Sequence, residues 1–112
     1  MRINFNNVEC EEVTNMRNGE GKITLRKIKE LPSNIKMYAL ITIHPFSSIG
    51  LHYHTDDAES IYVLNGSAIL IDDDKKEKLT KGDMHICYKN HKHSIINNTE
   101  EDLEIIAIVT KG

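Results

Sequence analysis

The sequence has two cysteines, two prolines and no apolar run close to the length of a membrane span. A transmembrane helix needs about 20 consecutive apolar residues, and residues Met1 to Asn7 lack the apolar stretch of a signal peptide. Cys10 and Cys87 lie far apart and form no Cys-x-x-Cys pair, so a reducing compartment is expected. Together these absences predict a cytoplasmic protein. Cys87 stands in an apolar run, which favours a position in the core.

The chain also lacks a strong charge of one sign. It has 14 Lys and Arg residues against 17 Asp and Glu residues, for a net charge of −3. Such a balance gives no general attraction to nucleic acid or to an anionic membrane, so neither partner is expected. The local charge run at 72–78 mixes both signs and is interpreted as a solvated hairpin. A length of 112 residues with 39% hydrophobic residues suits one domain with a single core.

Short strands separated by polar turns are the main pattern in the chain. Apolar residues alternate with others, as at Met37, Ala39 and Ile41, and do not recur at the helical period of about 3.6 residues. The expected strands are 35–43, 61–64, 68–71, 77–79, 84–87, 93–97 and 103–109, with one further possible strand at 23–28. Asn65-Gly66 between two of them is a hairpin signal. Roughly seven or eight strands at this spacing predict an all-β sandwich or barrel.

Two histidines and a glutamate give the strongest functional signal. Side chains in a strand alternate between faces, so His52 and His54 point the same way, about 6.5 Å apart along the strand. Tyr53 points the other way. A turn after His54 would return the chain and bring Glu59 beside the two imidazoles. This spacing of two imidazoles and one carboxylate is typical of metal ligands.

The second half of the chain repeats this theme more weakly, and the two segments together resemble the cupin superfamily. The family's first motif runs Gly, five residues, His-x-His, three or four residues, Glu, six residues and Gly. Its second motif runs Gly, five residues, Pro-x-Gly, two residues, His, three residues and Asn. The matching positions are His52, His54, Glu59 and Gly66 in the first motif, and Gly82, His93 and Asn97 in the second.

Three positions depart from the two motifs. Phe46 and Asn90 stand where the family has glycine, and Tyr88 stands where it has proline. Asparagine tolerates a left-handed backbone better than most residues. The departures therefore concern the geometry of the loops and not the ligand set. The resemblance covers about residues 35 to 109 and is closest to small single-domain cupins.

The resemblance implies one cupin domain over residues 1–112, with an N-terminal arm to about residue 30 and a jelly-roll β-barrel, or double-stranded β-helix, over about 31–110. The arm is polar and irregular from Val8 to Gly21. It is expected either to pair with a neighbouring subunit or to fray, because an isolated strand needs a sheet edge. The resemblance also implies a homodimer.

The family's metal ligands would fall on His52, His54, Glu59 and His93. Such a set suits one divalent transition metal per chain, namely Mn, Fe, Ni, Co, Cu or Zn. His91 is a rival, because it forms a second His-x-His pair with His93. The spacing from Gly82 to Asn97 favours His93.

Other residues are weaker candidates for the pocket. His44 stands outside both motifs and is expected to be structural or exposed. His85 could line the pocket, although its alternation within its strand favours the face away from the core. Tyr38, Tyr62 and Arg17 could orient a ligand, but no motif places them.

Four protein ligands leave up to two open positions in an octahedral shell. These positions could hold water, dioxygen or a small oxygenated molecule such as a carboxylate, keto acid, diol or sugar. Three function classes follow: a metal-dependent dioxygenase, isomerase or decarboxylase, a non-catalytic sensor or binding module, and a metal that only stabilises structure. A structural site is normally closed by its ligands, and an enzyme needs an acid or base beside the open positions. The sequence identifies no such acid or base.

Overall fold

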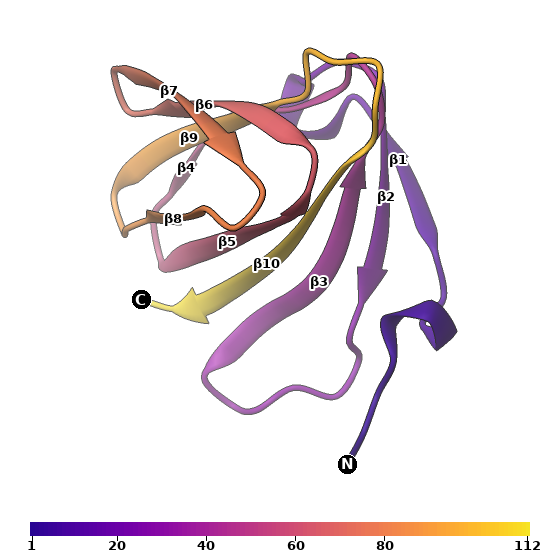
Figure 1. Ribbon diagram of the computed structural model, residues 1–112. Helices are drawn as coiled ribbons and strands as arrows, with labels where there is room; N and C mark the ends of the chain where they lie inside the picture. The colour runs from indigo at the N-terminus through magenta and orange to yellow at the C-terminus, as the bar shows by residue number, and fades with distance from the viewer.

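The computed structural model describes residues 1–112 as two antiparallel sheets that face each other (Figure 1). The six-stranded sheet has the order β1-β2-β3-β10-β5-β8, and the four-stranded sheet has the order β4-β9-β6-β7. The strands are β1 (Glu11–Thr14), β2 (Lys22–Lys27), β3 (Ile35–Ile43), β4 (Ser48–His54), β5 (Asp57–Asn65), β6 (Ser67–Asp72), β7 (Lys75–Thr80), β8 (Met84–Cys87), β9 (His91–Ile96) and β10 (Leu103–Lys111). Two short 3-10 helices, η1 (Phe5–Asn7) and η2 (Met16–Asn18), flank β1. No helix is long and apolar enough to cross a membrane.

Alternating side chains build the core between the two sheets. On β10, Leu103, Ile105, Ala107 and Val109 are buried while the residues between them are half-buried on the outer face. Leu103, Ile105 and Ala107 join inward-facing residues of other strands in one cluster of 15 buried residues. The arrangement is the jelly-roll β-barrel that the alternation and the motif resemblance predicted. Strands β3 and β8 begin and end at the predicted residues.

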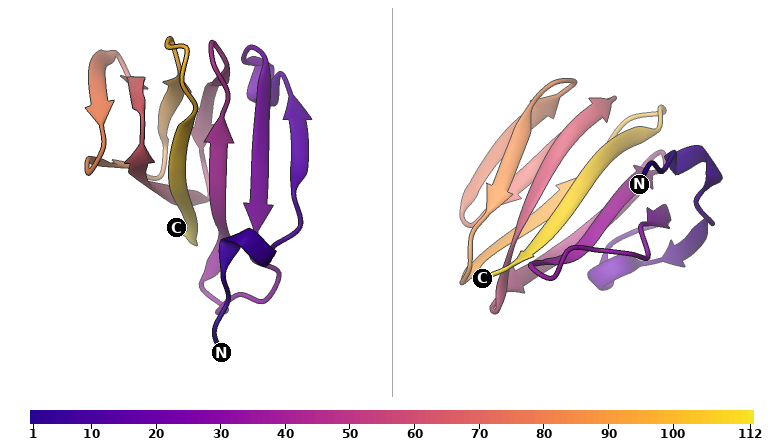
Figure 2. Two further views of the ribbon diagram at one scale, coloured as in Figure 1. Left: turned by 45° about the vertical axis from the view of Figure 1, so that its right-hand side comes forward. Right: turned by 90° about the horizontal axis from the view of Figure 1, so that it is seen from below.

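The N-terminal arm belongs to the six-stranded sheet of its own chain. Strand β1 pairs with β2, and β2 pairs with β3 (Figure 2). The Nη1 atom of Arg26 donates to the carbonyls of Phe5, Asn6 and Val8, at 3.3, 3.4 and 2.7 Å. The expectation of a frayed arm is therefore wrong. Strand β1 pairs with β2 of its own chain and needs no second subunit for this pairing. The alternation did not reveal β1, because three of its four residues are exposed.

Asn97 fixes the loop between β9 and β10. Its side chain is fully buried, and its amide nitrogen donates to the carbonyls of Ile43, His44 and Glu101. Its amide oxygen accepts from the backbone and the hydroxyl of Thr99. This amide makes five hydrogen-bond contacts, and its loss would leave the buried carbonyl of Ile43 and two part-buried carbonyls without this donor.

Two of the three residues that depart from the motifs adopt a left-handed backbone conformation. Asn90 adopts φ of 70°, the left-handed conformation that asparagine tolerates. Phe46 also adopts a positive φ, 56°, although it has a bulky side chain. Its ring is 63% exposed, so the backbone strain is not offset by burial.

Candidate metal centre

Both sheets contribute to one cluster of imidazole and carboxylate groups. His52 and His54 lie on the inner side of β4, and His93 lies opposite His52 on β9, because the two strands pair in that register. Glu59 lies on β5 of the other sheet. His54, Glu59 and His93 are buried and His52 is half-buried. The structure therefore brings together all four residues that the motifs identified, across 41 residues of chain between His52 and His93.

The donor atoms of these residues converge on one point. The Nε2 atom of His93 lies 3.1 Å from Nε2 of His54 and 3.2 Å from Nε2 of His52. The Oε1 atom of Glu59 lies 2.9 Å from Nε2 of His93 and 3.2 Å from Nε2 of His54. All four donor atoms lie within 4.8 Å of one another.

This separation fits a shared metal ion. Ligand atoms about 2.1 Å from one ion and at right angles to each other lie about 3.0 Å apart, and the four measured contacts range from 2.9 to 3.2 Å. Three imidazole nitrogens and one carboxylate oxygen are donors that divalent transition metals accept. The residues present therefore fit such an ion.

The other ring nitrogen of each histidine is already engaged. The Nδ1–H group of His52 donates to the carbonyl of Gly50, and that of His54 donates to Oδ1 of Asp57, both at 2.7 Å. Because carbonyl and carboxylate oxygens only accept, these contacts place a hydrogen on Nδ1. In the neutral imidazole, the form that binds a metal, the Nε2 lone pair then faces the cluster, whereas a protonated His54 donates from Nε2 to Glu59. Such outer hydrogen bonds orient metal-binding imidazoles in proteins.

His85 supplies the corresponding partner for His93. Its Nε2 atom lies 3.1 Å from Nδ1 of His93, and its side chain is buried. The expectation that His85 faces away from the core is therefore wrong. His85 and Cys87 are two residues apart on β8 and must share a face, which is the inner face because Cys87 is also buried. The burial predicted for Cys87 is the signal that could have placed His85.

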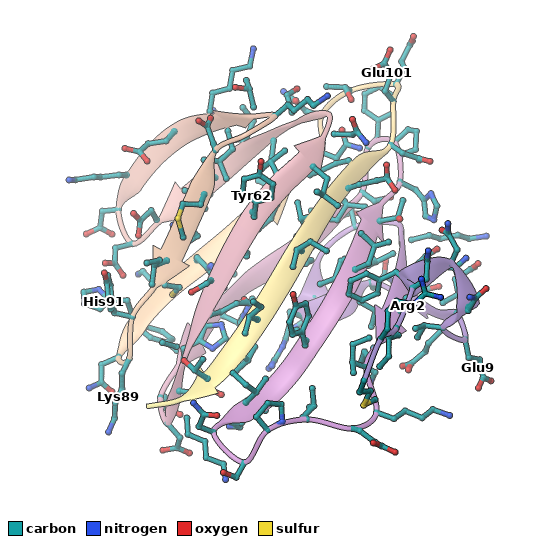
Figure 3. All side chains as sticks on the ribbon, turned by 60° about the horizontal axis from the view of Figure 1, so that its bottom comes forward. Arg2, Glu9, Tyr62, Lys89, His91 and Glu101 are labelled. Atoms are coloured by element: carbon teal, nitrogen blue, oxygen red, sulfur yellow. The ribbon has the colours of Figure 1, made fainter.

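The two remaining histidines lie outside the cluster. His44 is half-buried between Thr24, 2.7 Å from its Nε2 atom, and Asp102, 3.1 Å from its Nδ1 atom. Its predicted structural role fits these contacts. His91 lies at the exposed start of β9 (Figure 3), and its imidazole pairs with Asp73. The spacing of the second motif favoured His93 over His91, and the structure places His93, not His91, in the cluster.

Neighbouring groups in the cluster shift one another's pKa values. Burial alone would raise the pKa of Glu59, but hydrogen bonds from His54 and His93 outweigh burial and lower this pKa from 4.5 to about 2. The hydrogen bond to Glu59 raises the pKa of His54, against the effect of burial, with further help from Asp57. Burial lowers the pKa of His52, and the charges of His93 and Arg17 act in the same direction. The carboxylate is therefore ionised at neutral pH and ready to bind a cation.

A small cavity of about 80 Å³ opens onto this cluster. Its walls are Met16, Met37, Ile41, Ile49 and Val109, together with His52, His54, Glu59 and Arg17. Of the three pocket residues considered from the sequence, only Arg17 lies here. Tyr38 and Tyr62 project from the outer face of the six-stranded sheet, where Tyr62 is visible on β5 (Figure 3).

The sequence matches the family model described as Cupin domain over residues 39–109, and the chain belongs to this family. It is 30% identical to a protein from Thermotoga maritima named Oxalate-binding protein, with 97% of this chain and 93% of that protein covered. A solved structure described as a predicted oxalate decarboxylase from Thermotoga maritima is 27% identical, with a TM-score of 0.94 and full coverage of both chains.

More distant structures share the fold alone. A polyketide cyclase from Streptomyces resistomycificus has a TM-score of 0.81 at 19% identity, covering 98% of this chain and 78% of its own. The cupin domain of Cnp3 from Schizosaccharomyces pombe has a TM-score of 0.80 at 9% identity, covering 99% and 69%. These likenesses extend over β1 and β2 as well as the barrel strands.

Proposed function

We propose that this cupin binds one divalent transition metal through His52, His54, Glu59 and His93, and that the metal site binds a small carboxylate. The proposal rests on one observation, that the two ring nitrogens of each imidazole have different partners. Three Nε2 atoms and one carboxylate oxygen converge, while every Nδ1 atom has a partner outside the cluster. A purely structural histidine cluster would have no need to direct three lone pairs at one point.

The cavity supports a small ligand. Its volume of about 80 Å³ is well below the roughly 300–1,000 Å³ of pockets for drug-sized molecules, so only a few heavy atoms fit beside the cluster. A bound divalent metal would supply a Lewis acid for carboxylate oxygens. Arg17 adds a positive charge to otherwise apolar walls. Oxalate is the first ligand to test, because the Thermotoga maritima relative is named Oxalate-binding protein.

Binding is favoured over turnover by what surrounds the cavity. Decarboxylation, for example, replaces a carboxyl group with a proton, so it needs a proton donor near the ligand. Apart from His52, His54 and Glu59, the walls contribute Arg17 and five apolar side chains. None of these is a general acid or base at neutral pH. A binding or sensing role is therefore the better-supported function, and turnover of the bound acid is the second candidate.

Metal content tests the first half of the proposal. Protein purified without added metal and then loaded with Mn²⁺, Co²⁺ or Zn²⁺ should hold close to one ion per chain by elemental analysis. His52→Ala should lose most of this metal, and His91→Ala should keep it, because His91 is a histidine of the same strand pair outside the cluster. Full occupancy in the double variant lacking His52 and His54 would contradict the ligand assignment.

Calorimetry tests the second half. Binding of oxalate to the metal-loaded protein should give a measurable heat. The metal-free protein should show no binding. Equal binding with and without metal would contradict recognition through the metal site. Incubation with oxalate, followed by assays for formate and carbon dioxide, separates binding from turnover: an unchanged oxalate concentration supports the binding role, and steady product formation supports the second candidate.

A further inference from the structure

Arg17 lies where two cavities meet. The small cavity beside the histidine cluster and an outer cavity of about 390 Å³ share four lining residues, Arg17, Met37, His54 and Val109. The outer cavity is more polar and also includes Lys36, Tyr53 and Asp57. A ligand that enters from solvent through the outer cavity therefore passes Arg17 before it reaches the cluster.

The backbone of Arg17 is held in an unfavourable conformation. Its φ is 54°, and Asn15 and Asn18 in the same loop also have positive φ, 55° and 63°. A left-handed backbone costs energy for a residue with a long side chain and persists where the surrounding structure enforces it. Unlike asparagine, arginine has no short polar side chain that favours this region. Nothing in the loop's own sequence therefore accounts for arginine at this position.

Close packing against β4 enforces this conformation. A Cβ atom on Gly50 would lie 2.0 Å from the carbonyl oxygen of Arg17 and 2.7 Å from the nitrogen of Gly19, so the loop fits only against glycine. The carbonyl of the same Gly50 accepts the hydrogen bond from Nδ1 of His52. The loop of Arg17 and the imidazole of His52 are thus fixed to one backbone position.

The guanidinium group of Arg17 has no carboxylate partner in the structure. Other cations near the site are engaged: Lys36 pairs with Asp57 at 2.7 Å, and Arg26 holds three carbonyls of the N-terminal segment. Arg17 is itself exposed, but it lines the small cavity, whose walls beyond the proposed ligands are apolar, so a charge-assisted hydrogen bond made on that side is stronger than one in open solvent. Its guanidinium group is therefore free to pair with an anion that binds beside the cluster.

We infer that Arg17 is the specificity-determining residue of the site, which pairs with a carboxylate of the bound ligand and selects anions over neutral molecules of the same shape. The inference rests on the proposed function and adds the class of ligand that the site prefers, a small dicarboxylate or 2-oxo acid. A planar guanidinium matches a carboxylate with two parallel hydrogen bonds, which a lysine cannot reproduce.

Variants of Arg17 test the inference by calorimetry with the metal-loaded protein and oxalate. Arg17→Gln should weaken oxalate binding by at least about tenfold, the effect of losing a hydrogen bond to a charged group. Arg17→Lys should retain only part of the affinity. Affinity for Co²⁺ should not fall in either variant, because Arg17 is not among the four proposed ligands and its positive charge does not help a cation to bind. Oxamide, the neutral analogue of oxalate, should bind wild type and Arg17→Gln equally.

Two glycine variants separate the effect of the Arg17 side chain from the effect of the strained loop backbone. Arg17→Gly and Asn15→Gly both relieve a positive φ in the same loop, so neither should lower the Tm of the metal-free protein. Only Arg17→Gly should weaken oxalate binding. Lys81→Gln, which removes one exposed charge in the turn after β7, should leave oxalate binding unchanged and controls for net charge.

The possible failures are distinct. If wild-type protein binds oxalate and the Arg17 variants bind it equally well, or if Lys81→Gln causes the same loss, the role of Arg17 is overturned and the proposed function stands. If metal-loaded wild type binds no small carboxylate at all, the proposed function fails first. A loss of Co²⁺ affinity in Arg17→Gln would show that the residue supports the cluster and does not select the ligand.

Discussion

The Nε2 atom of His85 lies 3.1 Å from the Nδ1 atom of His93. With the Nε2 lone pair of His93 directed at the proposed metal, its Nδ1–H group donates a hydrogen bond to Nε2 of His85. The contact does for His93 what Gly50 and Asp57 do for His52 and His54. All three imidazoles are therefore oriented from behind, one by a carbonyl, one by a carboxylate and one by a second histidine.

Substitution of His85 should weaken metal binding without removing any proposed ligand. His85→Leu loses the acceptor for His93, and loss of such an outer partner typically costs roughly 10- to 100-fold in metal affinity. His85→Gln places an amide oxygen near the same position and should retain most of the affinity. Titration with Co²⁺ followed by its visible absorption measures both. Equal affinities of wild type and His85→Leu would contradict the positioning role.

Asp57 should control both metal affinity and its pH dependence. It accepts from His54, and its second oxygen is held by Lys36 at 2.7 Å. The raised pKa of His54, caused first by Glu59 and then by Asp57, means that a proton competes with the metal already above pH 6.5. Asp57→Asn should weaken Zn²⁺ binding at pH 8 by roughly 10- to 100-fold and shift the onset of proton competition to lower pH. Calorimetry between pH 5 and 8 measures both effects, and a Lys36→Gln variant should show a smaller change.

Glu59 should make the stability of the metal-free protein depend on pH at the acid end. Its pKa is about 2 in the folded protein and 4.5 as the ordinary value, so the unfolded chain binds more protons between these limits. The stabilisation is complete above pH 4.5 and decreases as the pH falls toward 2. In urea unfolding, the free-energy difference between wild type and Glu59→Gln should shrink across this window. A difference that stays constant from pH 6 to 2.5 would contradict the role assigned to the carboxylate.

The two cysteines should react at very different rates. Cys10 is exposed, whereas Cys87 is 1% exposed and burial raises the pKa of its thiol to about 12. A thiol that is neither accessible nor ionised is a poor nucleophile. Labelling of native protein with Ellman's reagent should modify one thiol quickly, and urea should expose the second. Cys10→Ser should remove the fast phase, and rapid labelling that persists in this variant would contradict the burial of Cys87.

The outer face of the six-stranded sheet is the surface that best suits the expected homodimer. Eight uncharged side chains lie side by side across four strands of this face: Tyr38, Leu40, Ile106, Ile108, Ser60, Tyr62, Met84 and Ile86. Tyr62 is 44% exposed and Met84 is 59% exposed. Uncharged, largely apolar faces of this kind are typical of interaction sites, and a second copy would offer the same face through a two-fold axis.

We predict that this face forms the dimer, burying more than about 1,200 Å² in total. Sedimentation at micromolar concentration should give about twice the mass of 12.8 kDa. Tyr62→Lys should shift the protein to the monomer, and Tyr53→Lys, at a similarly exposed tyrosine on the other sheet, should not. A wild-type monomer at this concentration, or a dimer that survives Tyr62→Lys, would contradict the assignment.

Local patterns in the sequence were enough for much of the fold. Side chains alternate between the faces of any strand, so the buried positions on β3 follow from residue order alone, whereas on β8 the same alternation favoured the wrong face for His85. The same parity placed His52 and His54 on one face. His93 and Asn97 required a longer pattern, and the structure gives that pattern a physical basis. Asn97 holds three loop carbonyls, which fixes the end of the strand that carries His93.

Only the tertiary structure decided what surrounds the proposed metal ligands. Glu59 reaches the histidines from the opposite sheet, and His85 comes from a strand that pairs with neither β4 nor β9. Arg17 reaches the cavity through a left-handed loop that packs against Gly50, a contact between segments 33 residues apart. Residue order determines which side chains share the face of a strand. Which strands and loops then meet depends on packing of the whole chain, because those contacts form between segments that have no local relationship in sequence.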